Sequence, residues 1–411
     1  MSCRAPVAGL TAQPVYPRVA STVSPAPQLR AMRVAMGRKI PGRRFASFPS
    51  VRRLFMVRHM KLRGRKGILG IVLLVLVAAG LVGSHILVSS RKPTVSAAPA
   101  CPTDHERALA CYEQYYGSIV AQQGVPEAFA ALKEQYGRDP DVQHLCHALT
   151  HVIGQAAARK YSDLPEAFQH GDNFCGSGYY HGVLQGRSFQ MGRGRLLSDL
   201  NSICAGIPGK ERKSLEYYNC VHGLGHAVMA ITGDDLFDAL RDCDGLMGSM
   251  EGNACASGVF MENLIVDGAH GGHYSKYLKP SEPLYPCTAV DKKYKPACFD
   301  LQTSYALGAV QGDFAKVFSL CAAVDVPFRL TCYQSLGRDA AATSLNQVPG
   351  TVARCALGTG QEQRANCIMG AVLDFVYYYH SDAQAKQLCA AVDPALQADC
   401  RSKTAKAVGL F

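Results

Sequence analysis

The sequence predicts an all-α fold of helical-hairpin repeats linked by disulfides, similar to an α-solenoid, after one N-terminal transmembrane helix. Three observations lead to this prediction. Sixteen of the 17 cysteines lie between Cys101 and Cys400. Their spacing repeats at about 34 residues, a period typical of two-helix units. A mostly apolar run at 67–88 precedes this region and is long enough to cross a bilayer.

The N-terminal segment, residues 1–66, holds 15 Lys and Arg and no Asp or Glu. It is rich in Pro, Ser and Ala and shows no helical or strand periodicity, so we expect it to be disordered. Translation is expected to begin at Met56 or Met60, because each would give a short basic stretch before the apolar run. The rest of the chain has 28 basic and 32 acidic residues, which predicts no nucleic-acid surface there.

The apolar run at 67–88 is predicted to be an uncleaved signal anchor and the chain's one contact with the membrane. Basic residues are denser before it than after it, which places the N-terminus in the cytoplasm and residues 101–411 outside. Residues 89–100 then form a short Pro/Ala/Ser linker. The alternative is a cleaved signal peptide with a site at 98–100, but the apolar run is long for such a peptide.

From Cys101 onward the cysteines alternate in a regular rhythm. The clearest copies are CTAVDKKYKPAC at 287–298, CAAVDVPFRLTC at 321–332 and CAAVDPALQADC at 389–400. The second cysteines of six copies, 220 to 400, are spaced by 35, 43, 34, 35 and 33 residues. Tetratricopeptide arrays have a similar period, but their Trp, Leu-Gly and Tyr pattern is absent. We therefore predict a similar architecture without membership of that family.

The even, dense cysteine set predicts disulfides formed in an oxidising compartment. No CxxC pair occurs, which argues against zinc ribbons, thioredoxin-like redox sites and c-type haem attachment. Sequential pairing within each repeat gives seven bonds, and elimination gives the pair 146–175. The predicted set is 101–111, 146–175, 204–220, 243–255, 287–298, 321–332, 355–367 and 389–400.

Two further features predict helices in this region. The Asp of each CxAVD copy is a good helix N-cap after a short turn, which predicts this role for Asp291, Asp325 and Asp393. A Gly follows the second Cys by three residues in CGSG, CVHG, CASG and CIMG. On a helix these two positions lie on one side, so the Gly is predicted to let a neighbouring helix approach closely.

Five of the histidines follow motif cysteines in the first half of the repeat region at offsets of 1, 5, 6, 2 and 6 residues. At about 100° per residue these offsets fall on one stripe of the helix, and stacked repeats would bring the stripes onto a shared face. Two pairs of these histidines, His147/His151 and His222/His226, have the i, i+4 spacing that lets both rings reach one ion. Neither pair forms an HExxH motif. The five are His147, His151, His181, His222 and His226.

These residues predict a site for a transition metal ion, Zn, Cu or Fe, because imidazole suits all three. Glu262, in the next motif helix, is predicted to act as a ligand or as the general base of a hydrolytic or oxidative metalloenzyme. Four tyrosines are expected nearby, Tyr179, Tyr180, Tyr217 and Tyr218. The alternative is a non-enzymatic scaffold that presents its surface to proteins or peptides, with the histidines as packing residues. The sequence names no substrate or protein partner.

Overall fold

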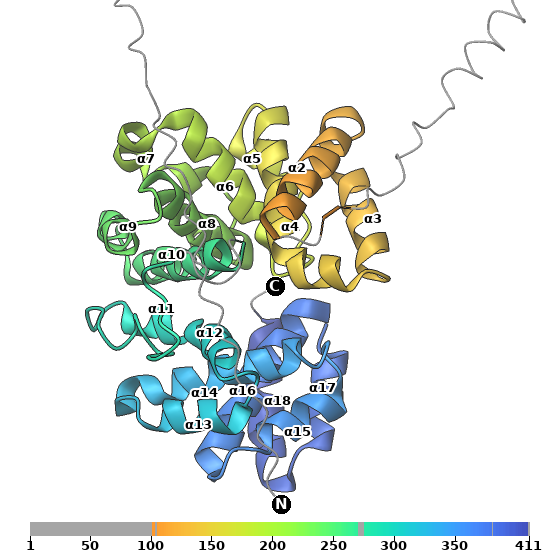
Figure 1. Ribbon diagram of the computed structural model, residues 1–411, viewed down its shortest axis with the longest axis vertical. Helices are drawn as coiled ribbons and strands as arrows, with labels where there is room; N and C mark the ends of the chain where they lie inside the picture. Colours follow the sequence, from red (N-terminus) through yellow and green to blue (C-terminus); the bar gives the residue numbers. More distant parts are fainter. Residues whose placement is uncertain (1–100, 103–104, 270–274, 380, 410–411) are drawn as a thin grey trace, which may run out of the picture. The chain divides into compact units, whose positions relative to one another are not determined.

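The computed structural model describes residues 101–102, 105–269, 275–379 and 381–409. The predicted N-terminal segment, transmembrane helix and linker all lie outside these residues. Within them the chain is α-helical with two short 3-10 helices and no strand, which confirms the predicted class (Figure 1). No helix in this part of the chain is both long enough and apolar enough to cross a membrane.

The first half, residues 105–269, is built around four long helices that pack side by side in chain order. Helix α4 packs on α6, α6 on α8, and α8 on α10. Helix α2 packs on α4 and also touches α10, so this row turns back on itself where an open solenoid would extend. The elements are α2 (His105–Gln122), α3 (Val125–Tyr136), α4 (Pro140–Lys160), α5 (Leu164–Gln169), α6 (Gly178–Met191), α7 (Arg193–Asp199), η1 (Ile203–Gly206), α8 (Leu215–Ile231), α9 (Leu236–Cys243) and α10 (Ser249–Ala269).

The second half, residues 295–408, repeats the pattern with α12, α14, α16 and α18 as successive neighbours. The short helices between them pack against this row, and α11 contacts both α10 and α14, which joins the two halves (Figure 1). The elements are α11 (Lys295–Phe299), α12 (Gln302–Ala309), α13 (Phe314–Ala322), α14 (Val326–Ala342), α15 (Val348–Cys355), α16 (Gln361–Tyr379), α17 (Ala383–Ala391), η2 (Pro394–Leu396) and α18 (Gln397–Val408).

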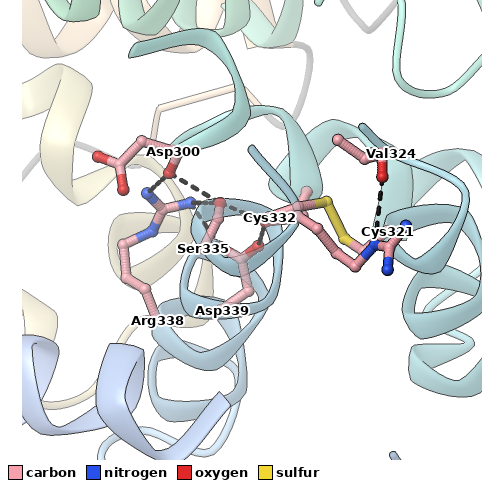
Figure 2. Close-up of a disulfide and its surroundings, with 9 residues drawn as sticks. Asp300, Cys321, Val324, Cys332, Ser335, Arg338 and Asp339 are labelled. Carbon is pink, nitrogen blue, oxygen red and sulfur yellow. Dashed lines mark hydrogen bonds and ion pairs between the residues drawn. A yellow bond between two sulfur atoms is a disulfide. The ribbon is translucent and has the colours of Figure 1, made fainter. Parts of the chain in front are cut away.

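All eight predicted disulfides are present. In four repeats the bond joins a short helix to the long helix that follows, as Cys321 of α13 and Cys332 of α14 show in Figure 2. Closing a loop of this size stabilises a fold by about 3 kcal/mol in the chain-entropy model. The Cys146–Cys175 bond differs, because it ties α4 to the turn before α6.

The predicted N-caps are only partly correct. Asp393 accepts a hydrogen bond from the Ala395 amide at the start of η2. Asp325 precedes α14 but makes no cap bond, and Asp291 lies ahead of α11, whose N-cap position is Tyr294. Each of these elements has a proline in its first turn, and the fixed φ of proline begins a helix without a capping side chain.

Glycines set the spacing of the long helices. At three crossings a Cβ on the glycine would collide with a backbone carbonyl of the neighbouring helix: Gly182 with His151, Gly258 with His222, and Gly370 with Gln334. The neighbouring helices therefore touch backbone to backbone. The predicted role of the motif glycines is confirmed for Gly178, Gly258 and Gly370, while Gly223 faces the Leu184 side chain, 3.2 Å from a Cβ placed there.

We predict that Gly258→Ala lowers the free energy of unfolding by about 1–3 kcal/mol, because the added methyl group must push α8 and α10 apart. Gly252→Ala in the same helix is the matched control. A Cβ at Gly252 has no atom within 4 Å, and alanine favours helix, so this variant should be neutral or up to about 1 kcal/mol more stable. Urea unfolding of the oxidised protein measures both, and equal values for the two variants would contradict this account of the crossing.

Candidate metal centre

The five predicted histidines come together in the first half of the domain. His147 and His151 lie on α4, His181 on α6, and His222 and His226 on α8. Neighbouring ring centroids are 4.6–5.5 Å apart. Helices α4 and α6 cross closely at Gly182, and Gly258 of α10 crosses α8 closely, so each of these two crossings contacts a helix that carries cluster histidines.

Hydrogen bonds on the outer side of the cluster orient three of the rings. His147 Nδ1 lies 2.7 Å from the Cys175 carbonyl, and His151 Nδ1 lies 2.9 Å from Oε1 of Gln185. His226 Nδ1 lies 2.6 Å from a carboxyl oxygen of Glu262. Each ring therefore turns its Nε2 atom inward. A carbonyl or carboxylate that holds the outer nitrogen in this way is the usual support of a metal-binding histidine.

The Nε2 atoms of His147 and His151 face each other at 3.1 Å. A backbone carbonyl only accepts hydrogen bonds, so His147 carries its proton on Nδ1. Gln185 donates its amide N–H to Glu262, which leaves Oε1 to accept from His151 Nδ1. Both inward nitrogens are then bare lone pairs that repel each other. Two nitrogens at about 2.0–2.1 Å from one ion, with an angle of about 100° between them, reproduce this separation.

The surroundings keep the imidazoles neutral. His151, His181, His222 and His226 are buried, and His147 is half-buried. Burial lowers the pKa of all five, that of His222 to about 3, and repulsion between the rings lowers four of them further. Neutral imidazole is the form that binds a metal ion. The cluster is therefore held in its ligating form at physiological pH.

Two buried nitrogens in the cluster have no hydrogen-bond partner, Nδ1 of His181 and Nδ1 of His222. The nearby Ala254 backbone opposes the lowering of the His222 pKa, although His222 Nδ1 makes no hydrogen bond of good geometry. An unsatisfied buried polar atom costs roughly 1–3 kcal/mol. Two such atoms in one cluster leave nitrogens that could bind a further group.

Glu262 on α10 lies behind His226. One of its carboxyl oxygens contacts His226 Nδ1, and the other accepts a hydrogen bond from Gln185 Nε2 at 2.8 Å. Burial raises the pKa of Glu262 to about 8, Asp234 adds to this, and the Gln185 bond opposes it. A cation on the far side of His226 would reverse the shift by favouring the carboxylate.

Gln185 is the residue of this site that the sequence analysis missed. It joins His151 to Glu262, and its Oε1 also accepts from Gln155 Nε2 at 3.1 Å. A signal was present in the sequence, since Gln185 follows His181 by four residues and so lies on the same face of α6. The sequence contains no such signal for the contact of the Cys175 carbonyl with His147.

An unusual turn positions that carbonyl. Cys175, Gly176 and Ser177 have φ values of 54°, 72° and 63°, three successive residues in the left-handed region. The two non-glycine members cost roughly 1 kcal/mol or more each. The Cys146–Cys175 disulfide anchors this turn to α4, the helix that carries His147. The strained turn thus aims a backbone acceptor at the outer nitrogen of His147.

The four tyrosines expected nearby play different parts. Tyr218 stacks on the His222 ring, with centroids 5.6 Å apart and planes at 27°. Tyr179 and Tyr180 pack in the core, and Tyr179 donates to the Ala167 carbonyl. Tyr217 donates to Glu251. Tyr218 is therefore the one of these four whose ring stacks on a cluster histidine.

The second half places a different cluster at the matching helix positions. Arg338 follows its motif cysteine by six residues, as His181 and His226 do, and Asp339 follows by seven, as Glu262 does. Asp339 accepts hydrogen bonds from Thr303, Ser304 and Arg338 at 2.6, 2.7 and 3.0 Å. Figure 2 shows Arg338 and Asp339 beside each other. These polar groups satisfy one another. The candidate metal centre thus belongs to the first half.

No protein-family model matches this chain, and neither a curated protein nor a solved structure does. Function is therefore inferred from the site itself: its imidazoles, its outer hydrogen bonds and its unpartnered nitrogens.

We predict that the folded protein, freed of metal by chelation, loses stability as pH falls below about 6.5. In the unfolded chain these histidines gain protons near that pH, while the folded chain keeps them neutral because burial lowers their pKa. Each histidine that stays neutral in the folded chain then lowers the free energy of unfolding by up to about 1.4 kcal/mol per pH unit. Urea unfolding at pH 7.5, 6 and 5 measures this slope.

His222→Gln should give a shallower slope, because one buried imidazole with a pKa near 3 has been removed. His170→Gln is the matched control, since His170 is exposed and stacks on Tyr161 outside the cluster. Its slope should equal that of the wild type. An unchanged slope in His222→Gln would show that the cluster does not resist protonation.

Proposed function

We propose that this chain is a membrane-anchored metal-binding protein whose five clustered histidines hold Zn, Cu or Fe outside the membrane. One observation carries the proposal. The bare Nε2 atoms of His147 and His151 face each other at 3.1 Å, and both outer nitrogens are committed to acceptors. A cation between the two rings removes their repulsion and explains the arrangement.

The donor set supports these three metals over others. Imidazole nitrogens suit Zn, Cu and Fe, whereas Mg and Ca prefer sets of oxygen ligands. Among the described residues, Glu262 is the one acidic residue grouped with the histidines. In the described part of the chain no free thiol competes, because the sixteen cysteines from Cys101 to Cys400 are all in disulfides.

We further propose metalloenzyme activity at this centre, of hydrolytic or oxidative type. His147 is half-buried while the other four rings are buried, so a small molecule can approach from its side. A bound ion would supply Lewis acidity or redox chemistry there. Glu262 contacts the outer nitrogen of His226, so we assign it the positioning of that ring in place of the general-base role that the sequence suggested.

The first test measures metal content. The oxidised full chain, stripped and then loaded separately with Zn, Cu and Fe, should retain at least one of these ions after desalting. The double variant His147→Ala/His226→Ala should retain at least tenfold less, because it removes one ligand from each i, i+4 pair. Thermal melting of both proteins, with and without metal, should show a stabilisation of the wild type that the double variant lacks.

The control is His170→Ala, which removes an exposed histidine outside the cluster and should bind as the wild type does. If the wild type retains none of the three metals, the metal-binding proposal is wrong. A scaffold that binds proteins or peptides through its helical surface then becomes the better account of the domain.

We propose that residues 67–88 anchor the chain and that the helical domain faces the outside. Eight disulfides in the described part of the chain support this topology, because such bonds persist in oxidising compartments. In cells that express the full chain, it should stay with membranes after an alkaline wash, and added protease should digest the domain without lysis. Release of the domain with a new N-terminus near 98–100 would instead identify a cleaved signal peptide.

A further inference from the structure

The cluster divides into two triads that share one histidine. One ligand nitrogen each from His147, His151 and His181 lies within 4.8 Å of the others, and the same holds for His181, His222 and His226. The two close Nε2 pairs, each at 3.1 Å, belong to different triads. Each triad has the three protein ligands typical of a metal site that keeps an open position.

A single ion would produce a different grouping. Five nitrogens bound to one ion at about 2.1 Å would all lie within about 4.2 Å of one another, because that is the separation of ligands on opposite sides. Such nitrogens would form one group of five, yet the histidine nitrogens form two groups of three that share His181. A third group joins His151, His226 and Glu262. Because Glu262 contacts the outer nitrogen of His226, we interpret this third group as a ligand with the residue that orients it, and not as a separate metal site.

His181 has the chemistry of a bridge. It lies on α6, between the helix of the first pair and the helix of the second. Its ring centroid is 5.5 and 5.4 Å from the rings on α4 and 4.6 Å from each ring on α8. Its Nδ1 is buried without a partner, unlike the outer nitrogens of His147, His151 and His226. No support therefore fixes one nitrogen of His181 as the outer one.

We propose that the centre holds two transition metal ions, one in each triad, with His181 bridging them through its two ring nitrogens. The proposal rests on the metal-binding function proposed above. A ring that binds ions through both nitrogens is an imidazolate, so its N–H proton leaves to solvent as the second ion binds. The resulting negative charge lies between the two cations and offsets their repulsion.

The test counts ions per chain. The oxidised full chain is titrated with Cu(II) and, separately, with Zn(II), and bound metal is measured against protein by elemental analysis. We expect two ions in the wild type. The double variants His147→Ala/His151→Ala and His222→Ala/His226→Ala should each keep one. Loaded with Cu(II), the wild type should show a spin-coupled pair, with an EPR intensity below that of two separate ions.

His181→Ala and His181→Gln test the bridge. Each triad loses a ligand in these variants, so both ions should be lost at concentrations where each double variant keeps one. Retention of two ions, or of one, would overturn the shared role of His181. Circular dichroism and non-reducing peptide mapping establish that the variants are folded, and His170→Ala should keep two ions.

A wild type with one ion would overturn the two-ion proposal while leaving the metal-binding function intact. A wild type with none would overturn both. Two ions in a double variant that lacks one whole pair would show that the triads are assigned wrongly, and would also overturn the proposal.

Discussion

The backbone contact between neighbouring long helices is the constraint on which the site depends. Of the three helices that carry the imidazoles, α4 and α6 approach more closely than ordinary side chains permit, at Gly182 against the His151 carbonyl. A second such approach, Gly258 of α10 against the His222 carbonyl, brings the helix of Glu262 onto α8. The histidine that meets the glycine is itself a cluster residue in both cases. The spacing of the fold and the geometry of the centre are thus fixed by the same contacts, and a larger residue at either glycine would change both together.

The disulfides make such a centre compatible with a stable fold. Burying four imidazoles and one carboxyl group, and holding Cys175 and Ser177 at positive φ, is unfavourable for folding. Covalent links between short and long helices oppose that cost, chiefly by restricting the unfolded chain. The second half has the same arrangement of helices but different polar residues inside it. Arg338 and Asp339 stand where the first half carries histidine and glutamate, and they form hydrogen bonds with each other and with neighbouring hydroxyl groups. The repeat therefore supplies the framework, and the polar residues that follow its cysteines on the inner stripe of each long helix differ between the two halves.

The parts of this structure that sequence could predict are those with a local period. The spacing of the cysteines predicted the disulfides. The helical offsets of His147 through His226 predicted that these histidines converge. Both predictions depend on regular repetition in the sequence. The contact of α2 with α10, the Cys175 carbonyl behind His147 and the support from Gln185 depend on how distant segments meet. Asp325 occupies the predicted N-cap position of α14 but its side chain makes no capping bond, and a proline in the first turn sets the start of this helix. The membrane segment stays a prediction.

The position of Glu262 bears on the chemistry such a centre can perform. A carboxylate bound directly to an ion would cancel part of its positive charge. Here the carboxyl group meets the outer nitrogen of His226, so the imidazole ring separates it from the inward-facing nitrogens. An ion bound by imidazoles without a carboxylate ligand would keep more of its positive charge and would supply Lewis acidity. The same arrangement lets Glu262 strengthen His226 as a ligand through the hydrogen bond. With the carboxyl group one ring away, an ion bound there would keep its Lewis acidity while the hydrogen bond between Glu262 and His226 would hold the direction of the ligand.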